Sequence, residues 1–258
     1  LIRRFDRGAF SASDGVADVR IGEHRATQNG VVGSLEQNGH AVSWDLKFQG
    51  HWGVLAGGPA YQHHHLASAL WYPAQADAEC SGSVTVDGQS FTFDRAPGYQ
   101  DRNWGQELPV WSFWVHANRF EDSPGSVLVC GGGLTRIANS APVRIACLVL
   151  RHHGRVHAFR NFQFEPVDIA RHPDGWTLDA RGLWHRLHVH AVTDPAQVYE
   201  VEIPTPLDGG FRLEESLCGR VDVTLYRRTA FGGWMDTVHL YSRVGAVEHG
   251  AVAAVGPR

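Results

Sequence analysis

One stretch of the sequence concentrates side chains that can take part in chemistry. Between residues 96 and 118, a carboxylate, a tyrosine, an asparagine and a histidine are interleaved with three tryptophans. These side chains are Tyr99, Asp101, Asn103, Trp104, Trp111, Trp114 and His116. Such a mixture is unusual in a loop that faces solvent, because indole rings present large apolar surfaces that favour burial. The stretch therefore indicates a site that holds an apolar molecule beside a few polar groups.

The spacing after Trp111 sorts these side chains onto two faces. In a strand, successive side chains point to opposite sides, so Ser112, Trp114 and His116 share one face. The apolar side chains between them share the other face. The competing interpretation is structural, with the tryptophans packing the floor of a barrel and Asp101 forming a surface ion pair with Arg102.

The chain has 16 histidines, which raises the question of a metal site. Residues 63–65 are consecutive histidines, but neighbours in a strand alternate sides, so only two of them would meet. His188 and His190 share a face, whereas His185 falls on the other in a regular strand. Two imidazoles are too few for a metal site of their own, so we predict no metal and treat these histidines as ordinary polar side chains.

Short alternating segments recur along the chain and predict strands. In residues 41–48 the even positions are apolar and most odd positions are small or polar, which is the period of a half-buried strand. The dipeptides Asn38-Gly39, Asp87-Gly88 and His153-Gly154 separate such segments and suit the positive φ values of tight hairpin turns. No long window carries a convincing helical stripe. We therefore predict an all-β protein of meandering antiparallel sheets.

Meandering strands usually close into barrels or sandwiches, because closure removes exposed sheet edges. The length of 258 residues suffices for two such modules. We expect an N-terminal module of residues 1–138 and a C-terminal module of residues 139–258. The expected seam is the polar stretch Ala138–Pro142, which follows the glycine run Gly131–Gly133. The tryptophans of the second module are assigned mainly to its core: Trp176, Trp184 and Trp234.

The composition excludes several classes of protein. A net charge of −4 with 19% charged residues lacks the basic excess that nucleic-acid binding exploits. No segment approaches the roughly 20 apolar residues that span a bilayer, and peripheral contact with a membrane surface is left open. Four separated cysteines indicate small buried thiols in a reducing, cytoplasmic compartment. Because the sequence starts at Leu1, an upstream targeting segment would not be visible in it.

Four segments carry a resemblance to a known family. They read APGYQDRNWG at residues 96–105, LPVWSFWVHANRFE at 108–121, GGGLTRI at 131–137 and CGRVDVTLYRR at 218–228. In these segments, and in order over about residues 40–250, the chain resembles the tocopherol cyclases of plants and cyanobacteria. It is similar, more loosely, to carotenoid 1,2-hydratases and to lipocalin-like pericyclases of polyketide pathways.

The resemblance implies two lipocalin-like antiparallel β-barrel or sandwich modules with an apolar cavity for the ligand. Tocopherol cyclases carry glutamate where this chain has Asp101, so the carboxyl group is kept on a shorter side chain. Their C-terminal segment usually ends in a longer glycine-rich tail that contains tryptophan, whereas here Glu248-His249-Gly250 runs into alanine and valine. These departures concern the substrate more than the fold.

The family's chemistry begins with protonation of an alkene, a very weak base that needs a strong, positioned acid. A carboxyl group in a dry aromatic pocket stays protonated near neutral pH, because desolvation penalises its charged form. The resemblance makes Asp101 the expected proton donor and Tyr99 its hydrogen-bond partner. His116, or a histidine of residues 63–65, would take the proton from the attacking phenol or water. The expected substrate-binding residues are Tyr61, His65, Trp71, Asn103, Trp104, Trp111 and Trp114.

On this interpretation the protein is a cofactor-independent cyclase for an apolar prenylated or polyene substrate, and three alternatives stay open. Capture of the cation by water would make it a hydratase. A cavity that folds a linear polyene, with hydrogen bonds to a carbonyl from Tyr99, Asn103 or His116, would make it a pericyclase. A cavity that only binds would make it a lipid carrier. Only the acid-triggered reactions need a carboxyl group withdrawn from water, so burial of Asp101 is itself a prediction.

Overall fold

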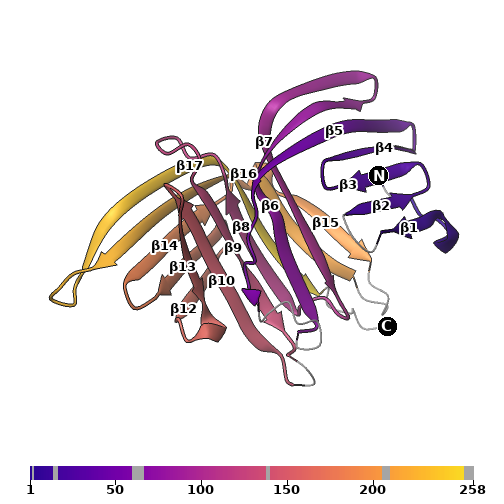
Figure 1. Ribbon diagram of the computed structural model, residues 1–258. Helices are drawn as coiled ribbons and strands as arrows, with labels where there is room; N and C mark the ends of the chain where they lie inside the picture. Colours follow the sequence, from indigo (N-terminus) through magenta and orange to yellow (C-terminus); the bar gives the residue numbers. More distant parts are fainter. Residues whose placement is uncertain (2, 14–16, 60–66, 138–139, 205–209, 253–258) are drawn as a thin grey trace. The chain divides into compact units, whose positions relative to one another are not determined.

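The chain is built almost entirely of antiparallel strands (Figure 1). The computed structural model describes residues 1, 3–13, 17–59, 67–137, 140–204 and 210–252. Within these residues the strands form two sheets, so the predicted all-β class is confirmed. No helix in the described ranges has the length and apolar character that crossing a bilayer requires.

The first sheet is a meander in which each described strand pairs with the next along the chain. Its strands are β1 (Phe10–Ala12), β2 (Asp18–Ile21), β3 (His24–Thr27), β4 (Gly30–Gln37), β5 (His40–Trp52), β6 (Ala69–Val86) and β7 (Gln89–Gly105). The predicted turns are confirmed, because Asn38-Gly39 joins β4 to β5 and Asp87-Gly88 joins β6 to β7. All four of these residues have positive φ, as this type of tight turn requires.

The second sheet has the order β11-β10-β9-β8-β17-β16-β14-β13-β12, and β15 also pairs with β16. Its strands are β8 (Trp111–Ala117), β9 (Val127–Thr135), β10 (Val143–His152), β11 (Arg155–Arg160), β12 (Val167–His172), β13 (Gly175–Arg181), β14 (His185–Val192), β15 (Tyr199–Pro204), β16 (Gly210–Arg228) and β17 (Trp234–Val252). The predicted turn His153-Gly154 joins β10 to β11, again with positive φ at both residues. Short 3-10 helices are η1 (Arg7–Ala9), η3 (Asn161–Gln163) and η4 (Pro195–Gln197).

The chain folds into two compact units whose limits differ from the expected modules of residues 1–138 and 139–258. The first unit comprises Leu1–Gly53 and Gln75–Gln100, and the second comprises Val54–Ala74 and Asp101–Arg258. Residues 138–139 of the expected seam lie outside the described residues, but their stretch connects β9 with β10, which pair along most of their length. The glycine run Gly131–Gly133 lies inside β9. A connection between two paired strands is a hairpin, so residues on both sides of the expected seam stay in one unit.

The second sheet curls around one apolar core. Phe159 and Val167, from the edge strands β11 and β12, pack in the same cluster as buried side chains from the middle strands. On β8, Phe113 and Val115 enter this core, as the predicted alternation requires. The other face of β8 carries Ser112, Trp114 and His116 and does not contribute to this core.

The tryptophans assigned to the core of the C-terminal half do not all lie in it. Trp176 is buried and packs with the apolar cluster, as expected. Trp184 is 65% exposed, so its assignment to the core is wrong. It lies in the turn between β13 and β14, beyond the last ladder pair Arg181–Arg186, where no neighbouring strand covers it. Trp234 is half-buried at the start of β17.

The cysteines follow the sequence expectation at three positions. Cys80, Cys130 and Cys147 are buried and Cys218 is exposed, and all four are free thiols. The exception has a local cause, because the register between β16 and β17 shifts between Ser216 and Gly219. Such a bulge turns the intervening side chains away from their regular alternation.

We expect Leu178→Ala to lower the free energy of unfolding by about 2–5 kcal/mol, because this fully buried side chain would leave a cavity in the core. Urea unfolding followed by tryptophan fluorescence measures the change. Leu183→Ala is the matched control, since the same atoms are removed from a side chain that is 65% exposed. Its effect should stay within about 0.5 kcal/mol, and equal losses for the two variants would contradict the placement of the core.

Candidate active site

A row of side chains crosses four strands of the second sheet on the face of β8 opposite to the apolar core. The register pairs Tyr199 of β15 with Glu215 of β16, and Glu215 with Glu248 of β17. Glu248 is paired in turn with Trp114 of β8. Directly opposed residues of neighbouring strands point to the same side, about 4.5–5.5 Å apart at their Cβ atoms. Two carboxyl groups therefore lie side by side between a phenol and an indole.

Gly131 of β9 continues the row beyond Trp114 and makes room for Trp71. A Cβ atom on Gly131 would lie 2.6 Å from Cζ3 of Trp71, so the indole takes the space of the missing side chain. Trp71, near the start of β6, and Asp101, near the end of β7, both belong to the second unit. The Nε1 of Trp71 donates a hydrogen bond of 2.8 Å to Oδ2 of Asp101. Gly131 thus positions the predicted acid through Trp71.

Asp101 is partly buried. Besides Trp71, the side-chain amide of Asn103 lies 3.4 Å from Oδ2 and donates to it. Oδ2 thus accepts a hydrogen bond from each of these two donors. The two donors hold the carboxyl group of Asp101 in place.

The carboxyl groups of the row are poorly solvated and influence one another. Burial raises the pKa of Glu248 to about 8, and the negative charges of Glu215 and Asp101 add to the rise. Burial also raises the pKa of Glu215, with a further contribution from Asp101. Groups that interact in this way titrate as a set. Glu248 therefore retains its proton near neutral pH.

Tyr199 closes the row at its β15 end. Its hydroxyl donates a hydrogen bond to Glu215, which lowers the pKa of Glu215 without cancelling the effect of burial. Burial and the neighbouring Glu215 raise the pKa of Tyr199 in turn. The phenol therefore stays neutral and keeps its role as a donor to the carboxyl group.

His116 and Trp114 lie on this same face of β8, as predicted. Their rings stack with centroids 5.8 Å apart and an angle of 8° between their planes. His116 is buried, with 5% of its surface exposed. Trp111 does not join them, because it stacks on Trp176 at 6.5 Å and packs against the apolar core. Its position two residues before Phe113 places it on the opposite face of the strand, so the expectation that it binds substrate is not supported.

The remaining predicted site residues are placed less closely together. Tyr99 is half-buried on β7, two positions before Asp101, and belongs to the first unit. Trp104 is half-buried three positions after Asp101. Tyr61 and His65 lie outside the described residues.

Sequence reasoning missed Tyr199, Glu215 and Glu248. A signal for Glu248 was present, because residues 244–250 form an apolar, small-residue segment in which one acidic side chain stands between valine and histidine. Glu215 was hidden by its acidic neighbour Glu214, since one of two adjacent acids in a strand normally faces solvent. Their proximity depends on the pairing of β15, β16 and β17, which the sequence pattern does not reveal.

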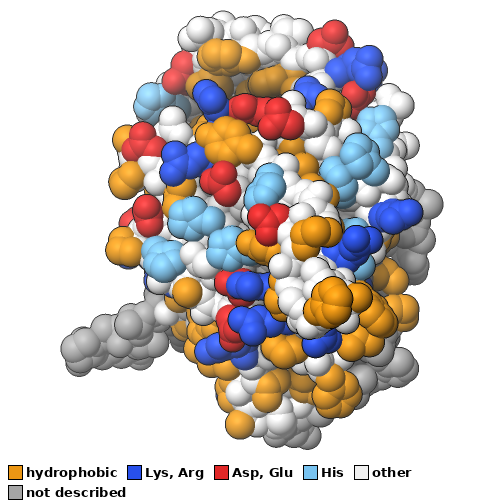
Figure 2. Space-filling view, turned by 90° about the vertical axis from the view of Figure 1, so that its left-hand side faces the viewer, with side chains coloured by type: hydrophobic (Ala, Val, Ile, Leu, Met, Phe, Trp, Pro, Cys, Tyr) orange, Lys and Arg blue, Asp and Glu red, His pale blue; other side chains and the backbone are white. Residues whose placement is uncertain are grey.

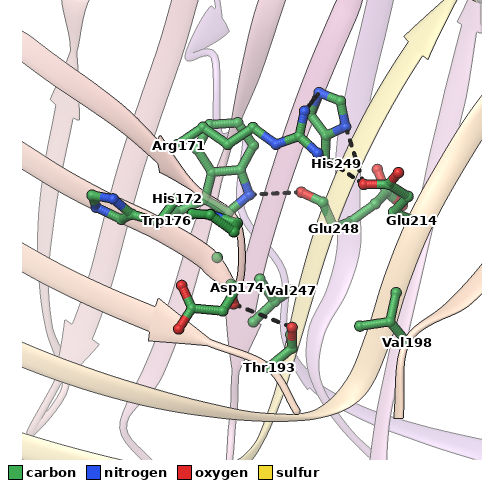
Figure 3. A pocket seen from close by; sticks show the side chains of 12 residues that line it. Arg171, His172, Asp174, Trp176, Thr193, Val198, Glu214, Val247, Glu248 and His249 are labelled. Atoms are coloured by element: carbon green, nitrogen blue, oxygen red, sulfur yellow. Dashed lines mark hydrogen bonds and ion pairs between the residues drawn. The ribbon is translucent and has the colours of Figure 1, made fainter. Parts of the chain in front are cut away.

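A second, polar group of side chains lies around a small cavity of about 50 Å³ (Figure 3). Arg171 donates a hydrogen bond of 2.8 Å to Glu214 Oε2 and lies 3.2 Å from His249 Nε2. Trp176 donates to the backbone oxygen of Glu248 at 3.0 Å. The cavity is far smaller than the roughly 300–1,000 Å³ of small-molecule sites. We therefore interpret these contacts as structural.

The histidines of β14 are engaged in local contacts. His188 pairs with Asp179 at 3.1 Å, and the ring of His185 meets that of His157 with centroids 4.6 Å apart. His190 lies within hydrogen-bond distance of Thr177. Across the described residues, no three His, Cys, Asp or Glu side chains are arranged to hold a metal ion.

Comparison with known proteins agrees with the resemblance seen in the sequence. Residues 24–251 match the family model described as tocopherol cyclase-like. The chain is 30% identical over 145 residues to a probable chloroplastic tocopherol cyclase of Oryza sativa subsp. japonica, over 55% of this chain and 29% of that protein. It is 28% identical over 134 residues to the chloroplastic tocopherol cyclase of Zea mays, over 51% of this chain and 25% of that protein. The match thus spans less than a third of either relative.

Solved structures support the fold. The crystal structure of CghA with Sch210972 superposes with a TM-score of 0.58, covering 96% of this chain and 74% of that one. The two sequences are 12% identical, so the likeness concerns the fold alone. An all-β architecture of antiparallel strands is therefore shared over nearly the whole of this chain.

We expect Gly131→Ala to displace Trp71 and weaken its hydrogen bond to Asp101, because the new methyl group would lie 2.6 Å from the indole. The strain should cost about 1–3 kcal/mol of stability. The indole N–H signal of Trp71 in a ¹⁵N spectrum, assigned with Trp71→Phe, should move. Gly8→Ala is the control, since no atom lies within 4 Å of the added group. An unchanged Trp71 signal in Gly131→Ala would refute the contact.

We expect the stability of the protein to fall as pH rises from about 5 to 8. The folded chain keeps the proton of Glu248 up to about pH 8, whereas an ordinary glutamate releases it near 4.5. The folded state binds more protons in this window, so its free energy of unfolding declines with pH. Urea unfolding at several pH values should give a shallower slope for Glu248→Gln. The exposed Glu36→Gln should keep the parental slope, and a parental slope in Glu248→Gln would show that Glu248 ionises normally.

Proposed function

Since the chain belongs to the tocopherol cyclase-like family, we propose that it is a cofactor-independent cyclase that closes a ring by protonating an alkene. The observation that carries this proposal is the set of Asp101, Glu215 and Glu248 beside Trp71 and Trp114. Within this set Glu248 keeps a proton near neutral pH beside Trp114, and Asp101 accepts a hydrogen bond from the indole N–H of Trp71. An alkene is so weak a base that a poorly hydrated acid held against it is the main requirement for its protonation.

The proposed donor is Asp101. Its proton, which it receives from Glu248 within the coupled set, passes to one alkene carbon and forms a C–H bond with the π electron pair, which leaves a tertiary cation on the other carbon. The phenol oxygen of the same substrate attacks this cation and forms the C–O bond of the ring. The phenolic proton leaves and restores the acid. The substrate and product have the same atoms and the same oxidation level, so the reaction is an isomerisation and consumes no co-reactant.

The aromatic side chains supply what the cation needs. The faces of Trp71 and Trp114 attract a positive charge through their ring quadrupoles and exclude water that would quench it. Exclusion of water also favours ring closure over hydration. Trp104 and Asn103 remain predicted substrate contacts.

The proton released by the phenol has two nearby acceptors. His116, stacked on Trp114, is the acceptor expected from the sequence. Glu215, whose negative charge adds to the raised pKa of Glu248, offers a second acceptor, because coupled carboxyl groups exchange protons among themselves. Tyr99, two positions before Asp101 on β7, remains the predicted hydrogen-bond partner of the acid.

The substrate class follows from the chemistry and from the relatives. One named relative is called a tocopherol cyclase and the other a probable tocopherol cyclase. Closing a ring by attack of a phenol on a prenyl cation requires both groups in one molecule. A phenol that captures its own prenyl cation needs no second substrate. We therefore propose a hydroquinone with an isoprenoid side chain as the substrate.

We expect the purified protein to convert a prenylated hydroquinone into a product of unchanged mass, without added metal or nucleotide. Asp101→Asn should lower the rate by about 10²–10⁴-fold, because the amide keeps the shape of the side chain but has no acidic proton to give. Chromatography with mass spectrometry measures the product. Asp94→Asn, at an exposed position on the same strand, should react at the parental rate.

Glu248→Gln separates the two buried acids. Loss of product in Asp101→Asn with retention in Glu248→Gln supports Asp101 as the donor, and the reverse pattern overturns this assignment in favour of Glu248. A product heavier by one water would show a hydratase. Cyclisation of a linear polyene that survives both substitutions would show a pericyclase, and tight binding without conversion would show a carrier. Each of these three outcomes contradicts the proposed function.

A further inference from the structure

Three neighbouring turns lie at one end of the second unit. None of them contains a residue of the row that includes Glu215 and Glu248, which we call the carboxyl row. The turns are residues 161–166 after β11, residues 182–184 between β13 and β14, and residues 229–233 between β16 and β17. The first two are linked by the hydrogen bond from Arg181 N to Pro166 O, at 3.0 Å. The last two are linked by the bond from Arg228 N to Trp184 O, at 2.8 Å. We call this group of segments the three turns.

Each of the three turns carries a large hydrophobic side chain into solvent. Phe164 and Phe231 are fully exposed, and Leu183 and Trp184 are each 65% exposed. Phe164 also has a φ of 64°, in the left-handed region that bulky residues rarely adopt. Scattered exposed hydrophobic residues are normal, but an aromatic or aliphatic side chain at the tip of every neighbouring turn is the pattern of an interaction surface.

The charged groups around the three turns are mostly positive. Four exposed arginines surround them: Arg155, Arg181, Arg227 and Arg228. Two acidic side chains lie nearby: Glu165, which accepts a hydrogen bond from the backbone of Arg160, and Asp236, which pairs with His239. They are fewer than the four arginines, so a positive excess remains. Burial lowers the pKa of His157 and of His185, so these rings are neutral at pH 7 and the positive charge belongs to the arginines. This local excess contrasts with the net charge of −4 of the whole chain.

A groove lies beside the three turns. The groove, of about 590 Å³, runs between β11 and the turn of residues 182–184. Its lining is mixed, with Val156, Leu183 and Trp184 beside Arg155, His157, Glu165 and His185. Figure 2, which faces the side of the molecule that lies at the left of Figure 1, shows hydrophobic side chains interspersed with acidic, basic and histidine side chains.

Aromatic tips with flanking arginines match the boundary of a lipid bilayer. Tryptophan and phenylalanine are favoured at the level of the headgroups, where part of the ring leaves water. Arginines near the surface of a membrane that contains anionic lipid each contribute about a fivefold increase in binding. We propose that the three turns dock the second unit on an anionic lipid bilayer, with Phe164, Trp184 and Phe231 inserted among the headgroups.

Charge complementarity favours this occupant over a second copy of the chain. A two-fold symmetric contact through the three turns would bring the same arginines of both copies together, which opposes association. A membrane carries no such conflict, since its charge is opposite to that of the turns. The proposal is independent of the proposed function, because docking involves no residue of the carboxyl row.

The test is co-sedimentation of the full chain with vesicles, without substrate. We expect binding to vesicles of phosphatidylcholine with about 30% phosphatidylglycerol, and several-fold weaker binding to phosphatidylcholine alone. The double variant Trp184→Ser with Phe231→Ser should lose at least about tenfold in partitioning, because two aromatic side chains no longer leave water. Arg181→Gln with Arg227→Gln should weaken binding to the anionic vesicles alone. Substitutions at these exposed positions should leave the unfolding midpoint unchanged.

Phe10→Ser is the matched control, since it removes an aromatic side chain that is 56% exposed in the first unit. This variant should bind like the parent. Equal binding of the Trp184→Ser, Phe231→Ser variant and the parent would overturn the proposal, as would equal binding to both kinds of vesicle. A concentration-dependent dimer that the double variant abolishes, in a protein that does not bind vesicles, would assign the three turns to self-association instead.

Discussion

The apolar core inside the second sheet is the constraint on which the rest of the second unit depends. Every strand of that sheet alternates its side chains, so filling the inside with residues such as Phe113, Leu178 and Leu187 commits the intervening residues to the outside. On β8 this choice leaves Trp114 and His116 on one face, and strand pairing then adds Glu248 and Glu215 beside them. The core thus determines which polar groups are gathered, although it contributes none of them.

The gathered carboxyl groups cost stability and supply reactivity. Poor solvation makes ionisation of Glu248 unfavourable, and the neighbouring Glu215 and Asp101 make it more so. A protein can keep such groups only where its core stabilises the fold by more than they destabilise it, which is a frequent property of active sites. The same penalty holds a proton in place near neutral pH, and the proposed ring closure requires that proton. Gly131 contributes to the same site. Because it has no side chain, Trp71 can occupy the space beside it and donate a hydrogen bond to Asp101.

An enzyme for an isoprenoid hydroquinone faces a problem of supply, since such molecules are concentrated in membranes rather than in water. The three turns, with their exposed aromatic tips and arginines, would bring the protein to that source. The carboxyl row and the docking surface involve different residues of the second unit, so each can be altered without removing the other. This separation allows membrane contact and chemistry to be examined one at a time.

Much of this protein was determined by its sequence alone. The period of two in segments such as residues 41–48 predicted the strands, and Asn-Gly, Asp-Gly and His-Gly pairs predicted the hairpins, because these properties depend on neighbouring residues. The motif around Asp101 and Trp114 likewise indicated the family and the predicted acid. Only the tertiary structure decided that Glu215 lies beside Glu248, that Trp71 covers Gly131 and that Trp184 is exposed. Each of these depends on the register between strands or on where a curled sheet leaves a turn uncovered. Such contacts join residues far apart in the chain, and no local pattern encodes them.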